Sequence, residues 1–167
     1  MGAASHTENS STREKILEHL FVGELLRSLW LKGISDVEVL RPEVDAGGYD
    51  LVVECAGILR HIQLKASYQK ASTMSVGVNV RLSAKPSGCV VWMKFDPETL
   101  ALGPFLWLGG APGAVLPNLG NRLGRHTRGN RVGLKGERQS IRVVRATSFR
   151  KLQSIDQVVT ELFGVTT

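Results

Sequence analysis

Residues 47–67 read GGYDLVVECAGILRHIQLKAS and form the most informative stretch of the chain. Two apolar runs flank Ala56-Gly57, a residue pair that suits the tight turn of a β-hairpin. Counting back along both arms from this turn places Asp50 directly opposite Gln63. Because side chains alternate along a strand, Lys65 projects from the same face as Gln63. The stretch therefore predicts that three polar groups meet at one end of a hairpin.

The length and composition indicate a single globular domain. The chain has 167 residues, of which 43% are hydrophobic, enough for one domain with its own core. No apolar run approaches the roughly 18 residues that a membrane-spanning helix needs, so we expect no membrane partner. Residues 1–11 are polar, lack the apolar core of a secretory signal and are expected to form a disordered leader. These features favour a cytoplasmic protein, associated with the nucleoid if the source is a prokaryote.

Hydrophobic periodicity predicts an α/β (α+β) domain over residues 12–167, in which a central mixed β-sheet is flanked by α-helices. In the closing helix, Ser154 and Gln157 have capping-box spacing and Gly164 is a stop signal. The Gly- and Pro-rich segment 109–139 is expected to be a loop. Helices are predicted at residues 12–32 and 154–164, and strands at 36–41, 49–54, 59–66, 74–82, 88–95, 100–108 and 139–146.

Several residues in apolar runs are expected to be buried. Cys55 and Cys89 have neither the number nor the spacing of a disulfide framework or a metal site, so reduced, buried thiols are predicted. Trp30, Trp92 and Trp107 are expected to belong to the core rather than to a surface that stacks on nucleobases.

Basic residues are concentrated in one part of the chain. Residues 122–151 contain ten lysines and arginines and a single acid, Glu137, whereas the remainder has eleven basic and fourteen acidic residues. Such an imbalance is typical of a surface that binds a polyanion, and the excess of arginine favours phosphate, because a guanidinium matches phosphate geometry. A solvated basic face or a flexible basic loop is the alternative. The expected nucleic-acid contacts, in an Arg-rich loop at about residues 120–139, are Arg122, Arg125, Arg128, Arg131, Lys135 and Arg138.

The first predicted helix supplies a further acid. At about 100° per residue, Glu24 lies close to Leu17 in the middle of the apolar stripe, where an unpaired carboxylate is costly. Glu24 is therefore the first candidate for a metal ligand or catalytic acid. Glu18 lies further from the centre of the stripe and is the second candidate. An ion pair between Glu24 and Arg27 on the rim of the helix is the structural alternative.

An all-oxygen ligand set is available from Asp50, Glu24, the amide oxygen of Gln63 and the backbone carbonyl of Leu64. Such a set suits Mg²⁺ or Mn²⁺ rather than zinc. The neighbouring Lys65 can orient a water molecule and offset the charge of a pentacoordinate phosphate. These residues therefore point to metal-assisted hydrolysis of a phosphodiester bond.

The order of these residues resembles the PD-(D/E)xK nuclease superfamily, whose members have the restriction-endonuclease-like fold. A helix acid, Glu24, is followed 26 residues later by Asp50 on a strand, and Gln63 comes 13 residues after that, in a Q-x-K variant that ends with Lys65. The spacings are similar to those of Holliday-junction-resolvase-like members, over roughly residues 12–108. By this resemblance, Asp50 is the central metal ligand and Gln63 the second ligand, while Lys65 activates water and Glu24 is the helix acid.

Two positions depart from the family pattern, because Tyr49 replaces a usual proline and Gln63 replaces a usual glutamate. The second change removes a negative charge and is expected to weaken metal affinity. The resemblance implies a metal-dependent endonuclease that hydrolyses nucleic-acid phosphodiester bonds, with DNA as the favoured substrate. It also implies a homodimer as one option, because two cuts need two sites. The alternative function is a catalytically inactive nucleic-acid-binding module on the same fold, acting through a partner protein.

Overall fold

The computed structural model describes residues 10–44, 46–125 and 136–165. The helices are α2 (Ser10–Leu31) and α3 (Ile155–Phe163), and neither has the length and hydropathy required to span a lipid bilayer. The strands are β1 (Val37–Leu40), β2 (Leu51–Cys55), β3 (Ile58–Tyr68), β4 (Ser75–Asn79), β5 (Gly88–Phe95), β6 (Leu102–Gly109), β7 (Leu123–Arg125), β8 (Glu137–Arg145) and β9 (Arg150–Leu152). Most of the predicted leader lies outside the described residues, and residues 10 and 11 belong to the first turn of α2.

Six strands form the main sheet in the order β1-β2-β3-β5-β6-β9. β3 and β5 run parallel, whereas every other neighbouring pair in this sheet is antiparallel. The predicted mixed sheet, flanked by helices in a single compact domain, is therefore confirmed. β3 lies at the centre of this sheet, so its polar side chains are placed in the middle of the molecule.

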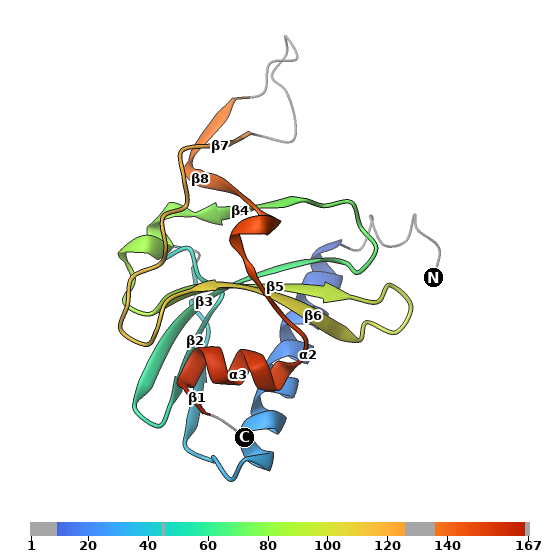
Figure 1. Ribbon diagram of the computed structural model, residues 1–167, viewed down its shortest axis with the longest axis vertical. Helices are drawn as coiled ribbons and strands as arrows, with labels where there is room; N and C mark the ends of the chain where they lie inside the picture. Colours follow the sequence, from blue (N-terminus) through green and yellow to red (C-terminus); the bar gives the residue numbers. More distant parts are fainter. Residues whose placement is uncertain (1–9, 45, 126–135, 166–167) are drawn as a thin grey trace.

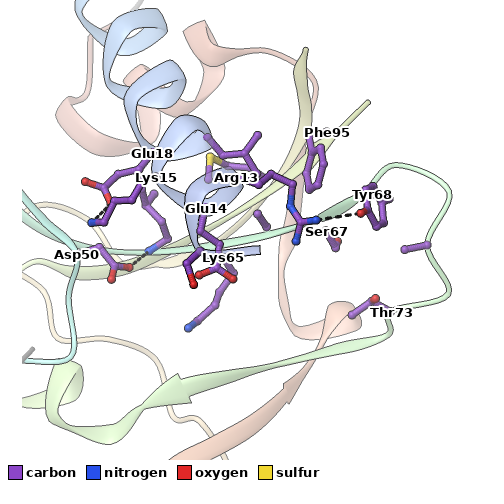
Figure 2. Close-up of a pocket in the computed structure, with 16 residues that line it drawn as sticks. Arg13, Glu14, Lys15, Glu18, Asp50, Lys65, Ser67, Tyr68, Thr73 and Phe95 are labelled. Carbon is purple, nitrogen blue, oxygen red and sulfur yellow. Dashed lines mark hydrogen bonds and ion pairs between the residues drawn. The ribbon is translucent and has the colours of Figure 1, made fainter. Parts of the chain in front are cut away.

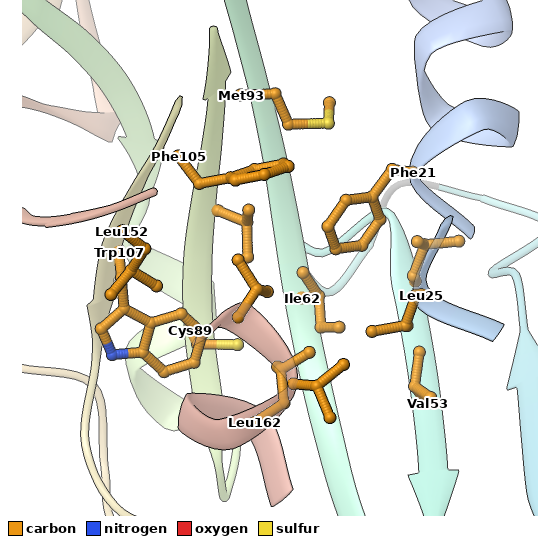
Figure 3. Close-up of a cluster of buried hydrophobic side chains, with 14 of the residues drawn as sticks. Phe21, Leu25, Val53, Ile62, Cys89, Met93, Phe105, Trp107, Leu152 and Leu162 are labelled. Carbon is orange, nitrogen blue, oxygen red and sulfur yellow. The ribbon is translucent and has the colours of Figure 1, made fainter. Parts of the chain in front are cut away.

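The fold has three layers (Figure 1). Helices α2 and α3 cover one face of the main sheet, and a small sheet in the order β4-β8-β7 covers the other. Apart from the half-buried Lys94, strand β5 is apolar because both of its faces are buried, with Cys89 directed toward the helices and Trp92 toward the small sheet. Figure 3 shows the helix-side core, in which Phe21 of α2 and Trp107 of β6 lie on the same face of the sheet as Cys89. The predicted burial of Cys55, Cys89, Trp92 and Trp107 is confirmed.

The small sheet corrects two predictions. One strand is predicted over residues 74–82, but β4 ends at Asn79 and is followed by a 3₁₀ helix, η1 (Val80–Ala84). Asn79 starts this helix because its side-chain Oδ1 accepts a hydrogen bond from the N–H of Arg81. Strand β7, only three residues long, lies within the segment 109–139 that is predicted to be a loop. It forms by pairing with β8 and not from a local sequence pattern.

Helix α2 confirms the predicted helix but not its predicted orientation. Phe21, Leu25 and Leu29 are fully buried, whereas Leu20 is 38% exposed. The helix is apolar around much of its circumference, so the sequence does not define which side faces the sheet. The prediction that Trp30 is a core residue is wrong, because its side chain is 70% exposed.

The ends of helix α3 are those that the sequence predicts. The side-chain oxygen of Ser154 accepts a hydrogen bond from the N–H of Gln157, as an N-cap residue does. Gly164 follows the last turn with a φ of 69°, a left-handed conformation that suits glycine. These two residues therefore set the length of the helix.

A buried arginine joins α3 to the main sheet. Arg60 of β3 is fully buried, and its guanidinium donates hydrogen bonds to the carbonyl oxygens of Leu162 (2.6 Å), Glu161 (2.8 Å) and Gly110 (3.1 Å). Carbonyl groups in the last turn of a helix lack partners within the helix. Arg60 supplies donors for two of them, and it also lies 5.7 Å from the ring centre of Trp107.

Replacement of Arg60 by methionine is expected to lower the free energy of unfolding by about 3 kcal/mol, because buried carbonyl groups lose their donors. Arg150 is a matched control, since its guanidinium forms an exposed ion pair with the side chain of the same Glu161. Arg150→Met should cost less than about 1 kcal/mol. Urea denaturation followed by circular dichroism measures both losses. Equal losses would contradict the structural role of Arg60.

Candidate active site and nucleic-acid interface

The β2–β3 hairpin has the predicted turn and register. The two turn residues, Ala56-Gly57, have φ values of 49° and 78°, the left-handed conformation that a two-residue hairpin turn uses. Starting at the turn, Cys55 pairs with Ile58, and the ladder continues to its last pair, Leu51 with Ile62. The next position along the two arms brings Asp50 opposite Gln63, as the sequence predicts.

Asp50 lies at an edge that the unequal lengths of β2 and β3 create. β3 has eleven residues and β2 has five, so β3 continues past Ile62 without β2 beside it. The backbone N–H of Asp50 donates to the carbonyl of Ile62 at 2.8 Å. Its side-chain Oδ2 accepts a hydrogen bond of 2.6 Å from the N–H of Leu64. The carboxylate of Asp50 is therefore held against β3, immediately next to Lys65 in the sequence of that strand.

Asp50 and Lys65 line one pocket, of about 600 Å³, together with residues from the first turns of α2. Figure 2 shows Glu14, Asp50 and Lys65 around the same space. Glu14 is exposed and Lys65 is half-buried. No hydrogen bond or ion pair joins the ammonium group of Lys65 to any residue that the structure describes. The pocket thus holds a cation with its charge available, beside two carboxylates.

Glu18 lines the same pocket, but its carboxylate already has partners. Oε1 accepts a hydrogen bond of 2.6 Å from Nε of Arg41, and Oε2 accepts one of 2.9 Å from Nζ of Lys15. Burial alone would raise the pKa of Glu18, but these hydrogen bonds outweigh it and hold the pKa below its ordinary value. The second candidate acid therefore acts as an ion-pair partner, and Glu14 is the α2 carboxylate that remains available to a ligand.

Gln63 faces a second pocket. It is buried, and its side-chain Oε1 accepts a hydrogen bond of 3.1 Å from the N–H of Asn79 at the end of β4. Lys65 lines this second pocket as well as the first. Lys65 therefore lies between two pockets and shares the first with Asp50 and the second with Gln63.

Glu24 is not brought together with Asp50 and Lys65. It lies in a shallow apolar groove along α2, beside Ile16 and Leu20. Burial raises the pKa of Glu24, and the charge of Arg27 opposes this effect. Its position on the helix separates it from the pocket in which Glu14 lies.

The second pocket is basic. Its cations are Lys65, Arg81 and Arg138, and no acidic side chain is among its described lining residues. The guanidinium of Arg81 donates a hydrogen bond of 3.1 Å to the carbonyl of Ala46, which holds it at the mouth of the pocket. Of the basic residues predicted to contact nucleic acid, Arg122, Arg125 and Arg138 are exposed, whereas Arg128, Arg131 and Lys135 lie outside the described residues.

The first pocket can accommodate a hydrated Mg²⁺ rather than a metal enclosed by protein ligands. Among the residues that the structure describes, no three Asp, Glu, His or Cys side chains form a ready metal-binding cluster. Mg²⁺ keeps several of its waters, however, and is commonly held by one or two carboxylates. Asp50 and Glu14 supply two such groups, and Leu64, whose backbone carbonyl is predicted to be a ligand, also lines this pocket.

Sequence reasoning missed Glu14 and Arg81. The signal for Glu14 is its position one turn before Glu18 on the same side of the helix, which becomes informative only once the orientation of α2 is known. Arg81 reaches the site through η1, which the predicted strand over residues 74–82 does not include.

Comparison with known proteins gives little further information. No protein-family model and no curated protein matches the chain. Among solved structures, it is similar to a bacterial homing endonuclease, I-Ssp6803I, with 26% sequence identity over 53% of this chain and 56% of that one. The TM-score is 0.27. The chain spans about half of the length of that structure, and the function is argued below from the residues of the two pockets.

The ion pairs of Glu18 predict a pH-dependent contribution to stability. Because its pKa is lower in the folded chain than its ordinary value of 4.5, the stabilisation is complete above about pH 4.5 and is lost as the pH falls through the folded pKa. At pH 7, Glu18→Gln should lower the free energy of unfolding by about 2 kcal/mol, and the difference from wild type should shrink in acid. Urea denaturation at a series of pH values measures it. The exposed Glu14→Gln is the control, and an equal, pH-independent loss in both variants would contradict this assignment.

Proposed function

We propose that the chain is a metal-dependent endonuclease of the PD-(D/E)xK type that hydrolyses phosphodiester bonds in DNA. The observation that carries this proposal is the shared pocket, in which Asp50 and Lys65 of the hairpin meet Glu14 of α2. An aspartate, a second carboxylate and a lysine around one open space are the groups that hydrolysis of a phosphodiester needs.

The two carboxylates would hold Mg²⁺ or Mn²⁺. Asp50 is the better fixed of the two, because its Oδ2 is hydrogen-bonded to the backbone of β3. Glu14, near the start of α2, approaches from the opposite wall of the pocket (Figure 2). A bound divalent cation lowers the pKa of a coordinated water and polarises a phosphoryl oxygen.

Lys65 supplies positive charge where negative charge develops. Its ammonium group has no competing partner among the described residues, so it can donate a hydrogen bond to a nucleophilic water or to a nonbridging phosphate oxygen. Both interactions favour the pentacoordinate transition state over the ground state. The strand holds its backbone in a fixed position, because β3 pairs with β5 at Lys65 and Trp92.

The basic pocket would hold the substrate backbone next to the reacting phosphate. Arg81 and Arg138 line this pocket, and Lys65 is shared with the first pocket. A polynucleotide strand that crosses from one pocket to the other therefore passes the ammonium group of Lys65. Contacts of this kind position a substrate without reading its sequence.

A nucleic-acid-binding module without hydrolytic activity is the second candidate function, and the environment of Gln63 favours it. A neutral amide stands where the resembling family has a carboxylate, and its oxygen already accepts a hydrogen bond from Asn79. In that case the basic pocket binds nucleic acid, and a partner protein supplies any chemistry.

The substitutions Asp50→Asn and Lys65→Met are expected to lower the rate of DNA cleavage by about 100-fold or more, because each removes a group that acts on the reacting phosphate. Glu14→Gln should lower it by about tenfold or more. Glu24→Gln is the matched control on the same helix and should leave the rate unchanged. Labelled linear, branched and single-stranded DNA, incubated with Mg²⁺, Mn²⁺ or EDTA, provides the measurement.

The outcome distinguishes the two candidate functions. Cleavage that requires the metal and is lost in the Asp50 and Lys65 variants, but not in Glu24→Gln, supports the endonuclease. Absence of metal-dependent cleavage, together with DNA binding that Asp50→Asn and Lys65→Met leave intact, would support the binding module and exclude the proposed hydrolase.

A further inference from the structure

Within the small sheet, strands β7 and β8 extend beyond the end of β4 as a two-stranded ribbon. Strand β4 pairs with β8 only from Asn79 opposite Ile141 onward, so residues 137–140 of β8 have no β4 residue beside them. Two of them pair instead with β7, Glu137 opposite Arg125 and Arg138 opposite Gly124, and the register shifts before the next pair, Leu123 with Arg142. Figure 1 shows β7 and the start of β8 projecting away from the main sheet and from the helices.

Both faces of β8 are open to solvent over the outer part of this ribbon, whereas Gly124 of β7 is buried. Residues 137–140 are all exposed, although side chains on a strand alternate between its two faces. A two-stranded ribbon is marginally stable in water unless it is anchored or bound to a partner. Here the anchor lies at the base, where Val144 is buried and Ile141 packs on Gly124 so closely that a Cβ at that glycine would lie 2.8 Å from its Cγ2.

The described part of the ribbon is strongly basic. Arg122, Arg125 and Arg138 are exposed, and Arg142 is half-buried at the base. The single acid of this part, Glu137, has its carboxylate near the side-chain amide of Gln139. No ion pair joins these arginines to an acidic residue within the ranges that the structure describes. Their charge is therefore available to an anionic partner.

The base of the ribbon opens into the proposed active site. Arg138 and Ser140 of β8 line the basic pocket together with Gln63 and Lys65 of β3. A polyanion held along the ribbon is thus continuous with the surface that presents Lys65. The ribbon and the hairpin are not separate surfaces.

From this geometry we infer that the β7–β8 ribbon is a binding arm for duplex B-form DNA and inserts into its major groove. The major groove of B-DNA, about 12 Å wide, admits a two-stranded β-ribbon, and its walls are lined with phosphates that exposed arginines can contact. The major groove of A-form RNA is too narrow for such an element, and a single strand has no groove. Groove binding does not require hydrolysis, so the inference rests on the proposed nuclease function only where it implies that DNA bound by the arm is cut next to Lys65.

Binding in EDTA tests the arm without cleavage. The full chain should bind a fluorescent DNA duplex at least about tenfold more tightly than the same sequence as a single strand or as an RNA duplex. The double variant Arg125→Gln/Arg138→Gln should weaken duplex binding by about tenfold. It should also reduce the slope of log affinity against log salt concentration by the amount expected for the loss of about two phosphate contacts. The control, Arg27→Gln/Lys151→Gln, removes the same charge from exposed sites on α2 and β9 and should have a much smaller effect. Thermal melts followed by circular dichroism establish that both variants are folded.

Chemical interference identifies the groove. Methylation of guanine N7 by dimethyl sulfate blocks the major groove and should prevent binding, whereas methylation of adenine N3 in the minor groove should not. Equal binding of duplex and single strand, or binding that ignores N7 methylation, would overturn the inference. Groove binding without metal-dependent cleavage would support the DNA-binding arm but contradict the proposed nuclease function. Metal-dependent cleavage without interference by N7 methylation would support the nuclease but overturn the proposed insertion of the arm into the major groove.

Discussion

The register of the β2–β3 hairpin is the constraint on which the candidate site depends. Ala56 and Gly57 both adopt left-handed conformations, and this turn pairs the two strands so that Asp50 comes opposite Gln63. A slip by one residue would direct Gln63 and Lys65 into the helix-side core and bring Leu64 to the opposite face. Because β3 continues beyond β2, the carboxylate of Asp50 also supplies the acceptor that the N–H of Leu64 would otherwise lack. The same residue therefore completes the sheet and takes part in the pocket.

The two faces of β3 carry basic residues in different environments. Arg60 projects toward α3, where its guanidinium is fully buried and hydrogen-bonded to three carbonyl oxygens. Lys65, five positions later on the opposite face, is half-buried between two pockets and has no partner among the described residues. A guanidinium with its directed donors suits the first environment, and a compact ammonium suits contact with a reacting phosphate. One strand thus carries both the connection to α3 and the proposed catalytic cation.

Local patterns predicted the hairpin, the ends of α3 and the buried strand β5, because each depends on residues that are neighbours in the sequence. The orientation of α2 could not be predicted, since its apolar residues surround the helix. This is why Glu24 is the first candidate and Glu18 the second, while Glu14 is missed. Two strands of the small sheet, β4 and β8, were predicted as strands, but their pairing into a separate sheet with β7 was not. The short strand β7 has no periodic pattern of its own and exists only through pairing with β8. Contacts between distant segments are the information that a single sequence carries least clearly.

The outer strands of the main sheet have a consequence for self-association. β1 has four residues with the exposed Glu38 among them, and β9 has three, including the exposed Arg150 and Lys151. An edge strand offers unpaired backbone groups to any other strand, but short and charged edges discourage such pairing. Two copies of the chain are therefore not expected to join by extending the main sheet. They would have to meet through side chains elsewhere, and monomers at high concentration should resist edge-to-edge aggregation.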